Sequence, residues 1–321
     1  MEMGLEQPDR IRVGVSRCLL GDRVRYDGQH KRDRYVSDVL GGYFDFVTVC
    51  PEVEIGLPIP RPPIRLVRIG DDIRVRGVKD AEADFTDALD GLFGQVAGRL
   101  QGISGYILKR KSPSCGMERV KVYNEKGETI AYDAGRFAKA LLAARPTLPV
   151  EEEGRLCDPL LRDNFITRVF AYARWQELVG EGTTVKELQR FHASHKMLLL
   201  AHHQEGYRKL GPLVAAARPE NLPETLCAYE KGFMTTLKNR ASLKGHTNVL
   251  QHLAGHLKKQ LDEDDRSELH TIINRYRAGL LPLVVPLTLL RHHFRRHPTD
   301  WVVTQVYLNP HPHELMLHNR V

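Results

Sequence analysis

Short β-rich runs alternate with helical patterns in the first half of the chain, and these runs stop near residue 160. They are IRVGVS (11–16), FVTVC (46–50), IRVRGV (73–78) and SGYILKR (104–110), with a helical pattern at 83–100 between the last two. Strands that alternate with helices predict a mainly parallel sheet covered by helices. Only helical patterns follow. We therefore expect an α/β N-terminal domain with a mainly parallel sheet, followed by an all-α C-terminal domain.

A turn-rich segment, residues 145–159, separates the two halves. The 321 residues exceed the size at which one hydrophobic core usually keeps growing. We expect one domain at 1–150 and a second at 151–321, with the three consecutive glutamates at 151–153 in solvent. Segment 56–66 contains four prolines, too many for a central strand, and is predicted to be a rigid loop over the sheet edge.

The chain has the features of a cytoplasmic protein. No uninterrupted apolar run is long enough to span a membrane, and the first ten residues lack the basic flank and apolar stretch of a signal peptide. The five cysteines are an odd number, which makes a disulfide framework a poor explanation for them. We expect no membrane association and no obligate protein partner, and a metal or catalytic role for some cysteines.

The positive charge lies in the second half. Residues 186–321 contain 19 Lys and Arg against 12 Asp and Glu, which accounts for the whole net charge of +7, and 14 of the 15 histidines. Basic side chains that neutralise phosphates release counterions, so this balance suits a polyanionic partner. Ordinary solvated helix faces are the alternative.

Three cysteines lie at the carboxyl ends of predicted strands: Cys18, Cys50 and Cys115. In open α/β sheets ligands bind at this edge, so the three thiols are expected to converge there. Their spacing alone is weak evidence, because no C-x-x-C pair is present. Buried cysteines can also act as small hydrophobes. The neighbours of Cys50 and Cys115, Pro51-Glu52 and Lys-Ser-Pro-Ser, are polar and turn-forming, which argues against that alternative.

Three segments resemble signature segments of the bacterial thiouracil desulfidase family: VSRCLLGDRVRYDG (15–28), CPEVEIGLPIPRPP (50–63) and KSPSCG (111–116). The resemblance covers roughly the first 145 residues. It implies that Cys18, Cys50 and Cys115 hold a 4Fe-4S cluster whose fourth iron has no protein ligand. A thiocarbonyl sulfur is soft, as is a cluster iron, so an open iron suits such a substrate. Hydrolysis can then proceed without net electron transfer.

The same resemblance assigns Glu52 as general base for the attacking water. Ser112 is a candidate for stabilising an oxyanion or relaying a proton, with Ser114 as a weaker candidate and turn capping as the alternative. Four further side chains are candidates for positioning substrate, with structural pairing or a solvated edge as the alternative: Arg25, Tyr26, Arg61 and Lys111.

The second half resembles the helical domain fused to this desulfidase in many bacteria, through segments 191–203, 237–259 and 307–321. Such fusions are implicated in removing sulfur from 4-thiouridine in tRNA, so tRNA is the expected partner. A modified base within folded tRNA must be exposed before an enzyme can reach it. Basic residues of this domain are expected to contact phosphates. The candidates are His192, His195, Lys196, Lys238, Arg240 and Lys244.

Three alternatives remain open. The chain could act on free thiouracil or thionucleosides, or it could be an iron–sulfur protein that binds nucleic acid or senses redox state without hydrolysis. The thiols could also bind zinc together with His30, the only histidine of the first half. Cys157 and Cys227 lie outside the matched segments and are interpreted as structural or incidental.

Overall fold

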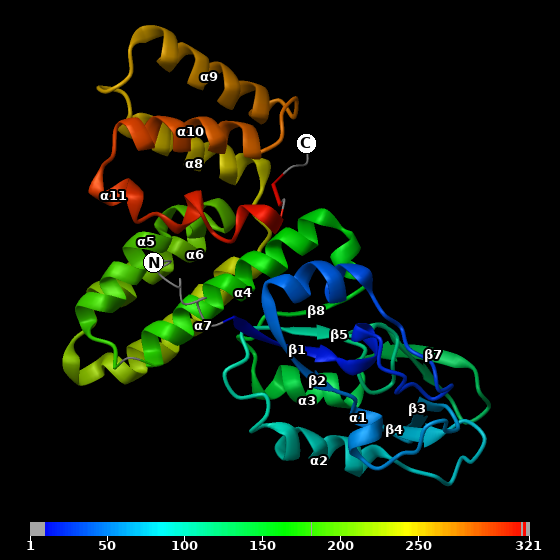
Figure 1. Ribbon diagram of the computed structural model, residues 1–321. Coiled ribbons are helices and arrows are strands. Elements are labelled where there is room, and N and C mark those ends of the chain that lie inside the picture. Colours follow the sequence, from blue (N-terminus) through cyan, green and yellow to red (C-terminus); the bar gives the residue numbers. More distant parts are fainter. Residues whose placement is uncertain (1–9, 181, 316, 319–321) are drawn as a thin grey trace, which may run out of the picture. The chain divides into compact units, whose positions relative to one another are not determined.

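The computed structural model describes residues 10–180, 182–315 and 317–318, and it divides into two compact units (Figure 1). The first unit ends at Cys157 and the second begins at Asp158. The sequence placed the boundary after residue 150. Strand β8 (Val150–Glu152) explains the difference, because it pairs in parallel with β5 (Tyr106–Leu108) and so belongs to the sheet of the first unit.

Sheet A of the first unit has the strand order β2-β1-β5-β8 and is parallel throughout, which confirms the expected sheet. Strands β1 (Ile11–Ser16) and β2 (Phe44–Val49) pair along their whole length. A Cβ atom at Gly14 would lie 2.2 Å from the ring of Tyr106 on β5, so glycine is needed for that ring to pack against β1. The sheet therefore forms a tightly packed base for the loops that follow its strands.

Two helices of the first unit, α2 (Thr86–Val96) and α3 (Arg136–Ala144), lie side by side next to sheet A (Figure 1). The ring of Phe137 on α3 lies 5.9 Å from that of Tyr106, centroid to centroid, which ties the helix to the sheet. On α2, Leu89, Leu92 and Val96 are buried at helical spacing. The helical pattern recognised at 83–100 thus corresponds to an amphipathic helix.

A second sheet, sheet B, was not anticipated and corrects part of the expected topology. Its order is β4-β3-β6-β7, and only the β3-β6 pair is parallel. The strands are β3 (Ile64–Ile69), β4 (Asp72–Gly77), β6 (Val120–Tyr123) and β7 (Thr129–Asp133). The run at 73–78 belongs to this sheet because a two-residue turn, with Gly70 at φ +59°, folds β4 back onto β3. The proline-rich loop is correspondingly shorter than expected, since β3 begins at Ile64.

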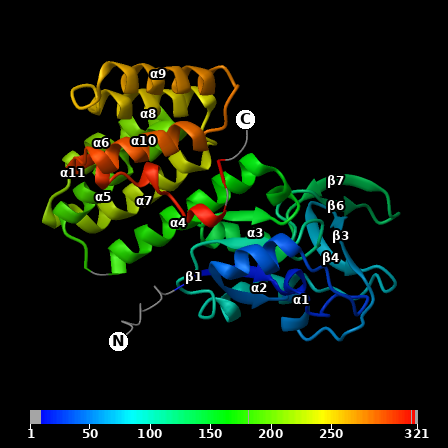
Figure 2. The same ribbon diagram turned by 45° about the horizontal axis from the view of Figure 1, so that its top comes forward.

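The described part of the second unit contains α-helices and short 3-10 turns, which confirms the all-α expectation for those residues (Figure 2). The helices are α4 (Pro159–Gly180), α5 (Val185–His202), α6 (Gln204–Ala215), α7 (Leu222–Lys238), α8 (Leu243–His256), α9 (Glu263–Arg277), α10 (Val284–Arg296) and α11 (Asp300–Val303). Thr184 caps the start of α5 in a capping box with Glu187. Helix α6 forms although its sequence contains two glycines and Pro212, which weaken the helical signal. No described helix is long and apolar enough to cross a membrane.

The C-terminal segment of the helical unit contacts α4 through Asp163, a half-buried carboxylate. Oδ1 of Asp163 lies 3.6 Å from Nε2 of His311 and 3.3 Å from Nε2 of His318. Burial opposes ionisation of Asp163, but its interactions with the nearby His318 and His311 rings outweigh this effect and hold the pKa of Asp163 well below its usual value. The carboxylate therefore links the two ends of this unit.

A carboxyl group whose pKa is lower in the folded chain stabilises the fold above its unfolded pKa and loses that contribution as the pH falls. We expect the stability of the helical unit to decrease below about pH 4. Asp163→Asn should lower its free energy of unfolding at pH 7 by about 1–3 kcal/mol and flatten the acid dependence. Urea unfolding followed by circular dichroism measures both, with Glu314→Gln, an exposed carboxylate of the same segment, as the control. Equal stability of Asp163→Asn and Glu314→Gln at pH 7 would contradict this role.

Candidate active site

Three cysteines lie where three neighbouring strands of sheet A end. Cys18 is in the 3-10 turn Arg17–Leu20 after β1, Cys50 begins helix α1 (Pro51–Glu54) directly after β2, and Cys115 is in the loop after β5. All three line one cavity of about 450 Å³. The carboxyl ends of parallel strands share one edge of a sheet, and this is why residues remote in sequence meet here.

The loop that holds Cys115 has little freedom to move. Oγ of Ser112 accepts hydrogen bonds from the backbone N–H groups of Ser114 (3.3 Å) and Cys115 (3.1 Å). A Cβ atom at Gly135 would lie 2.6 Å from the carbonyl group of Ser114, and one at Gly116 would lie 2.9 Å from the carbonyl oxygen of Ser112. Two glycines therefore let neighbouring backbone close tightly around the loop, which fixes the direction of the Cys115 side chain.

The three thiols have the properties of metal ligands in a protected site. Cys18 and Cys115 are buried and Cys50 is half-buried. Burial raises the pKa of Cys18 to about 12 and also raises the pKa values of Cys50 and Cys115, so these thiols hold their protons until positive charge is brought to them. Bound metal supplies that charge and deprotonates a coordinating thiol. The donor set thus fits an iron–sulfur cluster, which is held by cysteine thiolates.

The spacing of the thiols argues against one zinc ion. Ligands of a tetrahedral zinc lie within about 4 Å of one another, given bonds of roughly 2.0–2.3 Å. Within the described residues, the group of three possible metal ligands that meets a 4.8 Å limit is Asp163, His311 and His318 in the helical unit, and the cysteines do not form such a group. His30 is exposed and does not line the cysteine cavity. The thiols are therefore not placed as ligands of a single zinc ion.

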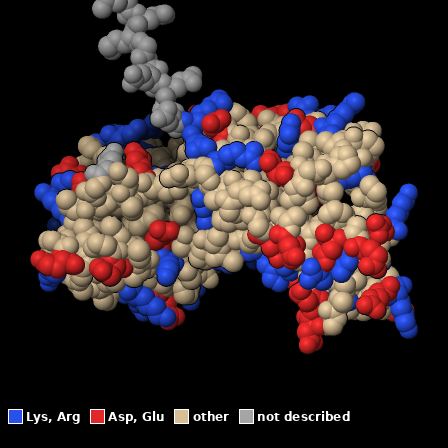
Figure 3. Space-filling model, turned by 90° about the horizontal axis from the view of Figure 1, so that it is seen from below, with Lys and Arg blue, Asp and Glu red and all other residues tan. Residues whose placement is uncertain are grey.

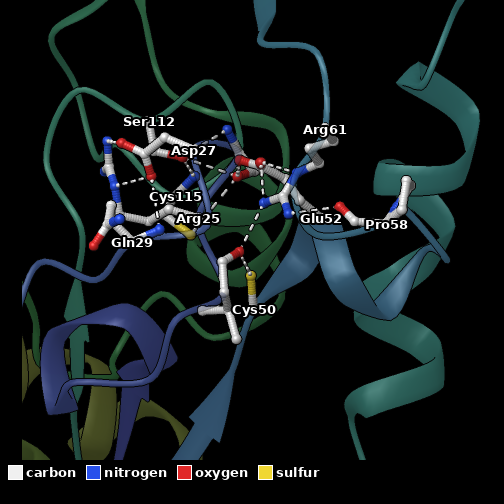
Figure 4. A network of polar contacts seen from close by, with 11 residues as sticks. Arg25, Asp27, Gln29, Cys50, Glu52, Pro58, Arg61, Ser112 and Cys115 are labelled. Atoms are coloured by element: carbon white, nitrogen blue, oxygen red, sulfur yellow. Dashed lines mark hydrogen bonds and ion pairs between the residues drawn. The ribbon is translucent and has the colours of Figure 1, made fainter.

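Glu52 is held at the cavity by three hydrogen bonds (Figure 4). Its Oε2 accepts from Nε (3.0 Å) and Nη2 (2.6 Å) of Arg61, whose side chain is 2% exposed. Its Oε1 accepts from Oγ of Ser114 at 2.8 Å. The carboxylate sits on α1, two residues after Cys50, so the strand end that positions a thiol also positions an acid–base group.

The structure exchanges the expected order of the two serines. Ser114, the weaker candidate, contacts Glu52 directly, whereas Ser112 reaches it only through Ser114, with an Oγ to Oγ distance of 2.9 Å. Since the single hydroxyl proton of Ser114 is donated to Glu52, Ser112 donates its own to Ser114. Ser112 also accepts two backbone N–H groups. It therefore has no second proton to give an oxyanion in this arrangement, and the relay role fits it better.

The four candidate positioning residues all line the cavity: Arg25, Tyr26, Arg61 and Lys111. Arg61 is structurally paired, because besides Glu52 it donates to the carbonyl oxygens of Val24 (3.0 Å) and Pro58 (3.3 Å). The guanidinium group of Arg25 lies 5.3 Å from the centre of the Tyr26 ring. Lys111 is exposed and has φ +60°, which turns the chain at the cavity mouth. Arg25 also pairs with Asp27, whose Oδ1 lies 3.3 Å from its Nε. Tyr26 and Lys111, both exposed, thus remain available to face a substrate.

The glutamate run at 151–153 was expected in solvent, and that expectation is wrong. Glu151, Glu152 and Glu153 are 4%, 7% and 7% exposed, on and just after β8. Glu153 pairs with Lys109 and accepts the backbone N–H of Arg110 at 2.8 Å, and Glu152 accepts that of Met117 at 2.8 Å. They hold both ends of the Cys115 loop. In the sequence, the basic residues at 109–111 are the feature that could have indicated partners for these glutamates.

Two of the expected RNA contacts in the helical unit are unsuitable as phosphate ligands. His195 is 1% exposed, donates to the carbonyl oxygen of Phe191, and burial lowers its pKa to about 3. His192 is half-buried against Tyr229, and burial lowers its pKa to about 4. Both are neutral at pH 7. The two histidines are three residues apart on α5 and therefore share a face, and both pack against α7.

The other expected contacts differ in their surroundings. Nζ of Lys196 lies 5.7 Å from the centre of the Trp301 ring, a cation–π contact. Lys238, Arg240 and Lys244 are exposed at the connection between α7 and α8, and no ion pair involves them within the described residues. The face shown in Figure 3 mixes basic and acidic side chains. The α7–α8 connection thus carries three exposed cations. Cys157 and Cys227 are exposed and do not line the cysteine cavity.

Comparisons with known proteins match the two units separately. A family model described as 2-thiouracil desulfurase matches residues 13–153, and one described as a protein of unknown function, DUF1722, matches residues 196–312. The uncharacterized protein YbgA of Escherichia coli strain K12 is 33% identical over 156 residues, which cover 48% of this chain and 92% of YbgA. The solved structure of the 4Fe-4S-dependent thiouracil desulfidase TudS is 35% identical, with a TM-score of 0.36, and the match covers 46% of this chain and 95% of that one.

Proposed function

Because the chain belongs to the 2-thiouracil desulfurase family through residues 13–153 and carries a DUF1722 domain at residues 196–312, we propose that it converts 4-thiouridine in tRNA to uridine. The observation that carries the chemistry is the cavity in which three buried or half-buried cysteines lie beside a hydrogen-bonded glutamate. The reaction replaces the thiocarbonyl sulfur by oxygen from water and releases hydrosulfide. It needs neither an oxidant nor a reductant.

We assign Cys18, Cys50 and Cys115 as the ligands of a 4Fe-4S cluster. Three cysteine ligands leave the fourth iron without a protein ligand, and the cavity provides space for a substrate there. When bound, the cluster supplies a soft Lewis acid that accepts the sulfur. The donor chemistry supports this assignment, since buried thiols with raised pKa values become stable ligands only when metal is present.

The protein side chains do the proton chemistry. Glu52 is the group placed to take a proton from the attacking water, and its hydrogen bonds to Arg61 and Ser114 fix the orientation of the carboxylate. The chain from Glu52 through Ser114 to Ser112 offers a path for that proton along the Cys115 loop. Arg25, Tyr26 and Lys111 line the cavity around the space for the pyrimidine.

The tRNA substrate is supported by free positive charge outside the cavity. Lys238, Arg240 and Lys244 are exposed, and cations of this kind neutralise RNA phosphates. The cavity of about 450 Å³ has to hold the cluster as well as the substrate, so it does not admit a duplex, and a base of tRNA has to be turned out to reach it. Free thiouracil or a thionucleoside fits the same cavity and is the second candidate. A protein that only bound nucleic acid or sensed redox state would not require Glu52 in this position.

Anaerobically reconstituted protein should remove the near-ultraviolet absorbance of 4-thiouridine from purified tRNA and release one sulfide for each base converted. The rate should fall as salt rises, because phosphate contacts are lost. Free 4-thiouridine and thiouracil serve as parallel substrates. If the protein turns over only the free compounds, the desulfuration reaction is supported and the substrate is a free thiolated compound instead of tRNA. If the protein binds tRNA but releases no sulfide, the non-hydrolytic alternative is favoured.

A further inference from the structure

Sheet B packs one face against a helix and leaves the other face open. Leu66, Val120 and Val122 lie in a hydrophobic core with Leu89 of α2. Successive side chains of a strand point to opposite faces, so Arg65, Lys121 and Tyr123 point away from that core. Lys121 is directly opposite Tyr132 in the antiparallel pair β6-β7.

The open face forms a groove of about 780 Å³, which we call the sheet B groove and define by Arg65, Arg119, Lys121, Tyr123 and Tyr132, with Lys111 at its mouth. Pockets of roughly 300–1,000 Å³ hold ligands of nucleotide size.

The sheet B groove opens toward the cysteine cavity. Ile64, Lys111 and Pro113 line both of them, so the two hollows meet at the start of β3 and at the loop that carries Cys115. A base in the cysteine cavity would therefore have its neighbouring nucleotide at the groove.

The groove concentrates positive charge that no carboxylate balances. It has four cations and one carboxylate, Glu118, which pairs with Arg155 at 3.2 Å. Within the described residues Lys111, Arg119 and Lys121 form no ion pair. Several arginines elsewhere in the same unit are paired with carboxylates, as Arg136 is with Asp90 and Arg61 is with Glu52. The charge in the groove is thus free for an anionic ligand.

The groove also presents aromatic rings. Tyr132 is 63% exposed, which is unusual for a large ring in the middle of a strand. The guanidinium group of Arg65 lies 5.3 Å from the centre of the Tyr123 ring, so a second flat surface lies beside the first. Rings for stacking bases, combined with cations along the backbone path, are the means by which proteins bind single-stranded nucleic acid.

We propose that the sheet B groove binds the RNA nucleotide adjacent to the thiolated uridine. The base stacks on Tyr132, and Arg119 and Lys121 contact the phosphates, while the uridine turns past Lys111 into the cysteine cavity. This inference rests on the proposed function, because it takes RNA as the substrate. It adds a specific contact on the catalytic unit itself, so the helical unit is not the sole source of RNA affinity.

The test compares two substrates, 4-thiouridine in tRNA and the free nucleoside, in the full-length reconstituted protein. Tyr132→Ala should lower kcat/KM for tRNA about tenfold, the usual effect of losing one stacked base, and Tyr132→Phe should retain it. Arg119→Gln combined with Lys121→Gln removes two phosphate contacts and should make the slope of log affinity against log salt less steep by about 1.4. All of these variants should turn over the free nucleoside at the wild-type rate. Lys126→Gln, in the turn of the same hairpin and outside the groove, is the matched control.

Equal losses on both substrates, or no loss on tRNA, would overturn the inference. If the wild-type protein desulfurates only free compounds, the proposed tRNA substrate fails first, and the groove is then judged by RNA affinity alone. In that measurement, equal tRNA affinity of Tyr132→Ala and the wild-type protein would overturn the inference, and weaker binding by the variant would support it. The failure of the groove and the failure of the proposed function therefore give different results.

Discussion

Replacing Cys115 by serine should abolish both cluster binding and desulfuration. The side chain is 5% exposed in a loop closed by Gly116 and Gly135, so no other thiol can take its place without moving backbone. A serine hydroxyl is a hard and weakly acidic ligand that does not substitute for a thiolate on iron. Iron and sulfide content, together with the visible absorbance of the reconstituted protein, measure the loss, and turnover should fall below detection.

The matched controls for Cys115→Ser are Cys157→Ser and Cys227→Ser. Both cysteines are exposed and outside the cysteine cavity, so these variants should keep wild-type iron content and turnover. A loss of iron in either control would mean that the ligand assignment is incomplete. Full iron content and full activity in Cys115→Ser would remove this cysteine from the ligand set.

Replacing Glu52 by glutamine should lower turnover by about 10²–10⁴-fold, the usual contribution of a positioned general base. The amide keeps the size of the side chain and one oxygen acceptor, but it cannot take up the proton of water. The cluster should still bind, since Glu52 is not a thiol ligand. The experiment therefore follows cluster absorbance and turnover in the same sample.

Stability has to be measured beside activity for this variant. The Arg61 side chain is 2% exposed, and removing the charge of its partner leaves a buried guanidinium group without a carboxylate. Breaking such a pair costs up to about 3–5 kcal/mol, and the amide oxygen should reduce that cost. Glu54→Gln is the matched control, because Glu54 lies on the same helix and pairs with Arg99 at 2.8 Å, outside the cavity. Near-normal turnover by Glu52→Gln with an intact cluster would exclude the general-base role.

The sequence did not predict which of the two serines contacts Glu52, nor that the glutamate run is buried. Sequence motifs identified the Cys115 loop, but the choice between Ser112 and Ser114 depended on which hydroxyl the loop turns toward Glu52. The run at 151–153 looked solvated because three consecutive charges normally are. It is buried because β8 completes sheet A next to Lys109 and to the backbone that follows.

His195 and sheet B show that a periodic sequence pattern does not identify the residues against which a helix or strand packs. Helical spacing puts His192, His195 and Lys196 on one face of α5, but it does not reveal that the two histidines pack against Tyr229 and Phe233 of α7. A strand pattern likewise does not reveal its partner, and a short turn at Gly70 was enough to divert β4 into a separate sheet. Local sequence patterns determine which way side chains point relative to one another, whereas packing determines what they meet.

The sequence by itself determined the α/β and all-α division, the parallel sheet and the three cysteines at its strand ends. These follow from local periodicity and from the rule that parallel strands end at one edge. Only the tertiary structure decided the partners of Glu52, the burial of residues 151–153 and the free cations of the sheet B groove. Each of these depends on contacts between residues far apart in the chain, whose energies no local pattern encodes.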